Sequence, residues 1–121
     1  MQKTILVVED HNDSSIILQF LLEGNGYKVK TARDGFEAIQ VVKGQVPDLI
    51  LMDLALPEVD GVTATKTIRA MDGAAETPIF AVTAHWSSYH PVATGTGLNG
   101  VLPKPLDHLK LLRLLKQYLA D

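Results

Sequence analysis

The run Thr4-Ile5-Leu6-Val7-Val8, followed directly by Glu9-Asp10, decides the fold. An unbroken apolar run of this length is typical of a strand buried on both faces, as in a parallel sheet with helices on each side. The abrupt change to two carboxylates indicates that the strand ends there. We therefore expect a central strand with an acidic pair at its carboxyl end.

Three further apolar runs have the same form and also lead into polar residues. Residues 49–52 lead into Asp53, residues 78–82 lead into Thr83, and Val101-Leu102 leads into Lys104-Pro105. Residues 27–32 instead alternate polar and apolar side chains, which is typical of a strand nearer the sheet edge. Five strands are therefore expected.

Helical segments separate these strands. The first follows the N-cap candidates Asn12, Asp13 and Ser14, carries Ile16, Ile17, Phe20 and Leu21 at helical spacing, and stops at Gly24-Asn25-Gly26; the second carries Phe36, Ile39, Val42 and Val46 before Pro47. Two more are expected at about residues 62–71 and 107–120. Between them, Pro91, Gly95 and Gly97 predict only a short, mobile helix within residues 84–99.

This alternation predicts an α/β fold. Because βαβ crossovers are right-handed, it forms a doubly wound five-stranded parallel sheet with helices on both faces, of flavodoxin-like type. The length of 121 residues fits one domain over residues 1–121.

Composition excludes several classes of function. The net charge is −3 and no basic cluster is present, so direct nucleic-acid binding is not expected. The absence of cysteine excludes thiolate nucleophiles and thiolate metal sites. No apolar run is long enough to span a membrane and no signal peptide is evident, so we expect a cytoplasmic protein.

The polar residues at the strand ends should meet at one edge of the sheet, namely Glu9, Asp10, Asp53, Thr83 and Lys104. Each alone is unremarkable, since such residues commonly cap helices, form turns or face solvent. Together, however, carboxylates about 4 Å apart repel by roughly 4 kcal/mol per pair at an effective dielectric near 20. Either raised pKa values or a divalent cation must offset this repulsion, and the oxygen ligands favour Mg²⁺ over Zn²⁺.

The chain resembles the receiver domain of two-component response regulators over essentially its whole length. The resemblance rests on Glu9-Asp10, the segment from Asp53 to Gly61, Thr83-Ala84 and Lys104-Pro105. It implies a phosphoacceptor signalling domain rather than an enzyme. The expected phosphoryl donor is a histidine kinase or a histidine phosphotransfer protein.

The resemblance also implies residue roles. Asp53 is the implied phosphoacceptor, and the implied Mg²⁺ ligands are Asp10, Asp53, Glu9 through water, and the main-chain carbonyl of Ala55. Thr83 and Lys104 are implied to contact the phosphoryl group, with a cis peptide bond before Pro105 aiming the lysine.

Other features concern how the signal is passed on and how solvent reaches the phosphorylation site. Val101 replaces the aromatic residue that the family usually carries three positions before the lysine, which puts the usual coupled switch in doubt. The leucine-rich last helix is either a wide core contact or part of a homodimer surface with the fourth helix and fifth strand. His11, His90 and His108 are expected to face solvent, while His85 screens water from the phosphorylation site or is a plain loop residue.

Three alternatives remain at this stage. A haloacid dehalogenase-like, Mg²⁺-dependent phosphatase needs a second acid two residues after its nucleophile, where this chain has Ala55. A flavin-binding module needs a hydroxyl-rich phosphate loop where this chain has Glu9-Asp10. The third is a pseudo-receiver that binds partners without phosphorylation.

Overall fold

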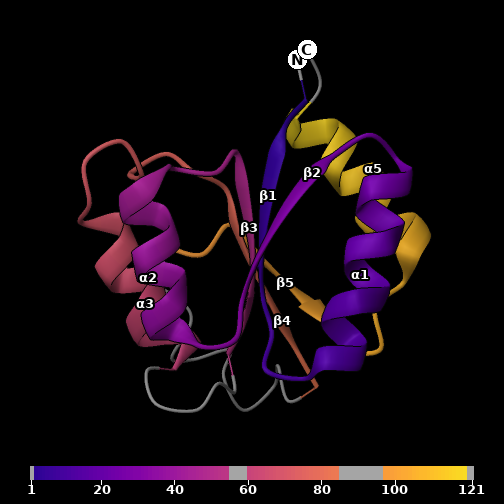
Figure 1. Cartoon of the computed structure of the whole chain (residues 1–121), viewed down its shortest axis with the longest axis horizontal. Coiled ribbons are helices and arrows are strands. Elements are labelled where there is room, and N and C mark those ends of the chain that lie inside the picture. Colours follow the sequence, from indigo (N-terminus) through magenta and orange to yellow (C-terminus); the bar gives the residue numbers. More distant parts are fainter. Residues whose placement is uncertain (1, 55–59, 85–96, 120–121) are drawn as a thin grey trace.

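The sheet confirms the predicted doubly wound architecture. The computed structural model describes residues 2–54, 60–84 and 97–119, and these form a five-stranded parallel sheet in the order β2-β1-β3-β4-β5 (Figure 1). The strands are β1 (Thr4–Val8), β2 (Lys28–Ala32), β3 (Leu49–Asp53), β4 (Ile79–Thr83) and β5 (Gly100–Pro103).

Strand β1 lies inside the sheet and contributes side chains to the hydrophobic clusters on both faces of the sheet. All five of its residues are buried. Ile5 and Val7 belong to one hydrophobic cluster, whereas Leu6 and Val8 belong to another. Because successive side chains of a strand point to opposite faces, this division explains the unbroken apolar run.

Helices cover both faces of the sheet. Figure 1 shows α2 (Gly35–Gly44) and α3 (Gly61–Arg69) on one side, and α1 (Asn12–Gly24) and α5 (His108–Leu119) on the other. Among the described helices, none combines the length and apolar character needed to cross a bilayer.

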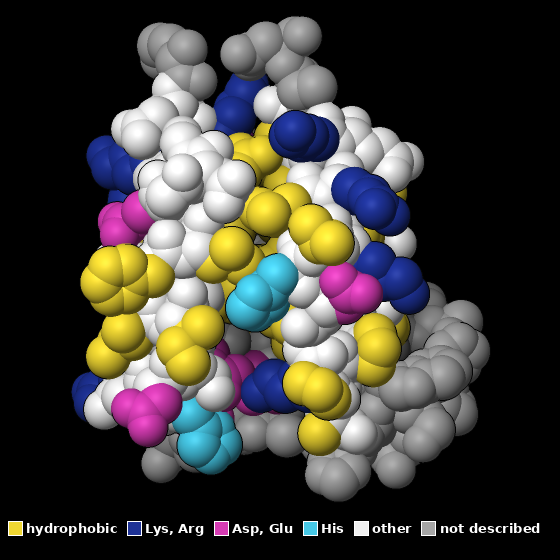
Figure 2. All heavy atoms as spheres, turned by 90° about the vertical axis from the view of Figure 1, so that its right-hand side faces the viewer, with side chains coloured by type: hydrophobic (Ala, Val, Ile, Leu, Met, Phe, Trp, Pro, Cys, Tyr) yellow, Lys and Arg dark blue, Asp and Glu magenta, His cyan; other side chains and the backbone are white. Residues whose placement is uncertain are grey.

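The first two helices form where predicted, but some of their apolar side chains are exposed. In α1, Leu18 and Leu22 are buried, whereas Ile16, Ile17 and Phe20 are 52%, 58% and 76% exposed. The helix carries more apolar residues than one stripe can bury, because only positions about four apart face the sheet. Apolar side chains consequently run along the α1–α5 face (Figure 2).

Helix boundaries give two corrections, and the predicted fourth helix is not tested. His11, rather than Asn12, Asp13 or Ser14, is the N-cap residue of α1, and its side chain makes no capping hydrogen bond. Helix α2 ends at Gly44, so Val46 follows the helix instead of belonging to it, and Phe36 is exposed. The fourth helix, predicted within residues 84–99, falls almost entirely outside the described residues, as do His85 and His90.

Arg69, at the end of α3, ties together three segments. Its guanidinium donates to the carbonyl of Gly97 at 2.8 and 3.0 Å, to Asn99 Oδ1 at 2.8 Å, and to the carbonyls of Ala74 and Ala75 at 2.9 and 3.2 Å. Asn99 Oδ1 also accepts a hydrogen bond from the backbone N–H of Ile79. One side chain therefore fixes the start of β4 and the approach to β5.

Replacing Arg69 with methionine is expected to lower the free energy of unfolding by about 2 kcal/mol, because several carbonyl groups lose a charged donor. Arg69→Lys should recover only part of this loss, since an ammonium cannot donate in the forked geometry of a guanidinium. Urea unfolding measures the difference.

Arg33→Met is the matched control. Arg33, just before α2, pairs with Glu37 at 3.5 Å, and both side chains are exposed. Its removal should change the free energy of unfolding by less than about 0.5 kcal/mol. Equal effects of the two substitutions would contradict the anchoring role of Arg69.

Candidate functional site

The ends of four parallel strands bring the predicted residues to one edge of the sheet. Glu9 follows β1, Asp53 ends β3, Thr83 ends β4 and Lys104 follows β5. The register pairs Val8 with Met52, Asp53 with Val82 and Thr83 with Pro103, so the strands end at nearly the same level. Glu9, Asp53 and Thr83 are buried. The predicted convergence is therefore present.

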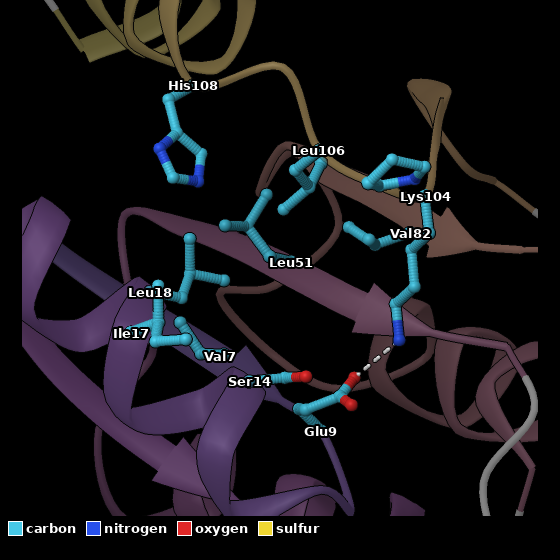
Figure 3. A pocket seen from close by; sticks show the side chains of 11 residues that line it. Val7, Glu9, Ser14, Ile17, Leu18, Leu51, Val82, Lys104, Leu106 and His108 are labelled. Carbon is cyan, nitrogen blue, oxygen red and sulfur yellow. Dashed lines mark hydrogen bonds and ion pairs between the residues drawn. The ribbon is translucent and has the colours of Figure 1, made fainter.

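Lys104 connects two of the buried acids. Its Nζ donates to Glu9 Oε2 at 2.9 Å, which is the contact drawn in Figure 3, and to Asp53 Oδ2 at 3.2 Å. The backbone N–H of Lys104 also donates to the carbonyl of Thr83 at 3.0 Å, and the Lys104–Pro105 peptide bond is cis. The sheet thus holds one ammonium group between carboxylates from two other strands.

Burial and charge shift the pKa values of this pair. Burial raises the pKa of Glu9 above its usual value, and the hydrogen bond from Lys104 only partly opposes this effect. For Lys104, burial alone would lower the pKa, but the hydrogen bond to Glu9 and the charges of Asp53 and Glu9 together raise it. Lys104 therefore stays positively charged at neutral pH and counters the negative charge at the site.

A cavity of about 280 Å³ adjoins this pair (Figure 3). Its walls are mainly apolar side chains from the strands, α1 and the segment before α5, including Leu18, Leu51 and Leu106. These walls leave Glu9 and Lys104 with apolar surroundings on one side, which agrees with the effect of burial on the pKa of Glu9.

Asp10 and His11 extend the site beyond the Lys104 contacts. Asp10 Oδ1 is shielded from solvent and makes no hydrogen bond within the described part of the chain. His11 Nδ1 lies 3.2 Å from Asp10 Oδ1 and 3.2 Å from Glu9 Oε1. Ligand atoms of Glu9, Asp10 and His11 all lie within 4.8 Å of one another.

These residues fit a hard divalent cation. Within the described residues Asp10 Oδ1 makes no hydrogen bond, although His11 Nδ1 lies 3.2 Å away, and carboxylate oxygens are the ligands that Mg²⁺ prefers in proteins. Asp53 lies at the same edge, where it contacts Lys104 and interacts with Glu9. Ala55, the fourth expected ligand, lies outside the described residues.

Sequence reasoning missed His11 as part of this site. The histidine faces solvent as predicted, but its ring also contacts both acids that precede it. The available signal was its position directly after the acidic pair, where the chain turns from β1 into α1. His108 is exposed as predicted.

Replacing Lys104 with methionine is expected to lower the free energy of unfolding of the metal-free protein by about 1–3 kcal/mol. The substitution removes the ammonium from between Glu9 and Asp53, which are both buried, and uncompensated buried charge is costly. Urea unfolding in the presence of a chelator measures this change.

Lys43→Met controls for loss of a positive charge, because Lys43 is exposed in the last turn of α2. It should change the free energy of unfolding by less than about 0.5 kcal/mol. If both variants are as stable as the natural sequence, the contacts of Lys104 do not stabilise the site.

Comparison with known proteins identifies the family of this chain. The sequence model of the response regulator receiver domain matches residues 5–116. The chain is 33% identical to the polar-differentiation response regulator DivK of Brucella anthropi, with 100% of this chain and 99% of that protein covered. It is 36% identical to an uncharacterised 14.6 kDa protein of Leptolyngbya boryana, over 97% of this chain and 90% of that protein.

Solved structures with a similar fold lead to the same family. The receiver domain of the sensor histidine kinase PA1611 from Pseudomonas aeruginosa, which has a magnesium ion in its active-site cleft, superposes with a TM-score of 0.93 at 33% identity, covering 100% of both chains. The chemotaxis protein CheY4 of Vibrio cholerae gives a TM-score of 0.91 at 28% identity, over 98% of this chain and 100% of that one. With the family match extending over most of the sequence, the chain belongs to the response regulator receiver domains.

Proposed function

We propose that this chain accepts a phosphoryl group on Asp53 and thereby switches a surface that binds a partner. The observation that carries the proposal is the placement of Lys104 Nζ between Asp53 and Glu9 at the strand ends. A buried carboxylate held beside a fixed cation is what phosphoryl transfer requires, because catalysis is mainly positioning and charge neutralisation.

The donor is proposed to be a phosphohistidine on a histidine kinase or a histidine phosphotransfer protein, the kinds of protein with which receiver domains interact. A carboxylate oxygen of Asp53 attacks phosphorus as the phosphorus–nitrogen bond of the donor breaks, with both electrons of that bond staying on the imidazole nitrogen. The product is an acyl phosphate on Asp53. Lys104 stabilises the charge on the transferring oxygens, and Asp53 needs no proton removed because it reacts as the carboxylate.

Mg²⁺ is the proposed cofactor. Asp10, Asp53, Glu9 through water and the main-chain carbonyl of Ala55 are its proposed ligands, and the oxygen of Asp10 that makes no hydrogen bond among the described residues supports this assignment. The magnesium ion in the receiver domain of PA1611 supports it as well. When bound, the cation neutralises charge on the transferring phosphoryl group.

Thr83 is the proposed first element of the switch. It is buried at the end of β4, next to the strand that carries Asp53. A phosphoryl group at Asp53 brings three strong acceptor oxygens, to which a threonine hydroxyl can donate. Val101 packs against Leu54, Val62 and Ala81. Because Val101 is smaller than the aromatic residue that is usual in the family at this position, we expect the surface that changes on phosphorylation to lie in another part of the molecule.

The homodimer surface stays a prediction. Leu109 on α5 is exposed, whereas Leu111, Leu115 and Leu119 are buried, so the last helix has both a core stripe and an outward apolar residue. The fourth helix, which would complete this surface, falls outside the residues described.

The test is incubation with acetyl phosphate and Mg²⁺ followed by intact-mass measurement. We expect one added phosphoryl group, no addition when the metal is chelated, and no sustained hydrolysis of a phosphomonoester. Repeated turnover would favour the phosphatase alternative. An unmodified protein that still binds its partner would favour the pseudo-receiver alternative.

A further inference from the structure

The cavity beside the contact between Glu9 and Lys104 has the size of a small-molecule site. Its volume is about 280 Å³. Ligand pockets in proteins measure about 300–1,000 Å³, and an apolar cavity of about 150 Å³ already holds benzene. The space therefore suits a substituted benzene ring or an aliphatic molecule of roughly ten non-hydrogen atoms.

The walls of this cavity are mainly aliphatic. Figure 3 shows side chains from α1, from the sheet and from the segment before α5 lying around one space. Several of them also belong to the hydrophobic cluster on the α1–α5 face of the sheet, where close packing normally leaves few voids larger than a water molecule. The aliphatic wall residues are Val7, Ile17, Leu18, Leu51, Val82 and Leu106.

The polar end of the cavity supplies a hydrogen-bond donor. Lys104 Nζ donates to Glu9 Oε2 at 2.9 Å and to Asp53 Oδ2 at 3.2 Å, whereas an ammonium group carries three N–H bonds. Within the described residues, these two contacts leave one N–H for an acceptor oxygen of a ligand. Ser14 also lines the cavity, and its hydroxyl can donate or accept.

The charges at this end favour a neutral ligand. Glu9 and Lys104 both line the cavity and are paired with each other. A hydroxyl group suits such a pair, because it can accept from the ammonium and donate to the carboxylate. A charged head group would instead lose its hydration among apolar walls and would meet one like charge.

We propose that this cavity binds a small neutral molecule that has an apolar body and one hydroxyl group, with the hydroxyl on Lys104 and Glu9. The aliphatic walls hold the body of the ligand. Because the same ammonium stabilises the transferring phosphoryl group, an occupied cavity slows phosphorylation of Asp53. This regulation rests on the proposed function, whereas the binding does not.

Binding of 4-ethylphenol to the natural protein, followed by methyl NMR, is the first test. We expect a dissociation constant of about 1 mM or below. The methyl signals of Leu18, Leu51 and Leu106 should shift, whereas those of Ile16, which is outside the lining, should not. Ethylbenzene should bind about threefold or more weakly because it lacks the oxygen, and 4-ethylbenzoate and 4-ethylbenzylamine about fivefold or more weakly because they are charged.

Two variants test the location and the contact. Ile17 lines the cavity and is 58% exposed, so the indole of Ile17→Trp can cover the space and should weaken 4-ethylphenol binding by about tenfold or more. Ile16→Trp is the matched control, because Ile16 is 52% exposed on the same helix, and it should change this affinity by less than about twofold. Lys104→Met should make the affinities for 4-ethylphenol and ethylbenzene equal.

The rate of labelling by acetyl phosphate tests the regulation. Saturating 4-ethylphenol should slow labelling of the natural protein by about fivefold or more and leave Ile17→Trp unaffected. An unchanged rate with the cavity occupied would overturn the regulation. Absence of binding, shifts away from the cavity, or equal affinity for 4-ethylphenol and ethylbenzene would overturn the binding site while leaving phosphorylation of Asp53 intact. Binding in the cavity of a protein that acetyl phosphate cannot label would reject the proposed function instead.

Discussion

Replacing Asp53 with asparagine is expected to abolish the phosphoryl adduct formed with acetyl phosphate and Mg²⁺. An amide has no ionised oxygen to attack phosphorus, so the labelling rate should fall by several orders of magnitude. The change is nearly isosteric, and Lys104 retains its contact with Glu9 at 2.9 Å, so the fold should persist. Intact mass, with circular dichroism as the check on folding, measures the result.

Asp60→Asn is the matched control for this experiment. Asp60 caps α3 by accepting a hydrogen bond from the backbone N–H of Thr63 at 2.8 Å, and asparagine caps helices equally well. This variant removes the same charge close to the site in sequence and should label normally. A persistent adduct on Asp53→Asn would show that another residue accepts the phosphoryl group.

The sequence predicted the positions of the site residues because a parallel sheet leaves few options. When β1, β3 and β4 are buried on both faces, a polar residue at the end of each must lie at the carboxyl edge. The burial of Glu9, Asp53 and Thr83 follows from this topology. The type of sheet and the location of the site could therefore be predicted together.

Side-chain contacts could not be predicted in the same way. The apolar spacing in α1 predicted a helix, but it did not distinguish the buried Leu18 and Leu22 from the exposed Ile16 and Phe20, since the rotation of the helix depends on its packing against the sheet. The contacts of His11 were missed for a similar reason. Its contact with two carboxylates depends on the turn between β1 and α1, which has no periodic signal.

Gly61 carries the second large expected effect, because the first residue of α3 lies against the backbone that follows β3. A Cβ atom built at Gly61 would meet the carbonyl oxygen of Asp53 well inside contact distance, with Leu54 Cα at 2.8 Å and the carbonyl carbon of Asp53 at 3.0 Å. These are backbone atoms, so no side chain can rotate to make room. The close approach, rather than an unusual backbone angle, is what requires glycine here.

Gly61→Ala is expected to lower the free energy of unfolding by about 2–3 kcal/mol and to slow acetyl phosphate labelling by about tenfold or more. The methyl group must push α3 away or displace the peptide that carries the Asp53 carboxylate. Displacement of a reacting group by even about 1 Å slows chemistry strongly. Urea unfolding and the rate of mass addition measure the two effects separately.

Gly44→Ala distinguishes this steric effect from the general cost of replacing glycine. Gly44 is the last residue of α2 and has nothing within 4 Å of a built Cβ, so alanine should leave stability unchanged or raise it slightly. If Gly61→Ala labels as fast as Gly44→Ala and is equally stable, the contact between α3 and the Asp53 peptide does not position the carboxylate. If labelling falls while stability is kept, this contact acts on the chemistry alone, because the peptide that limits packing at Gly61 is the one that carries the reacting side chain.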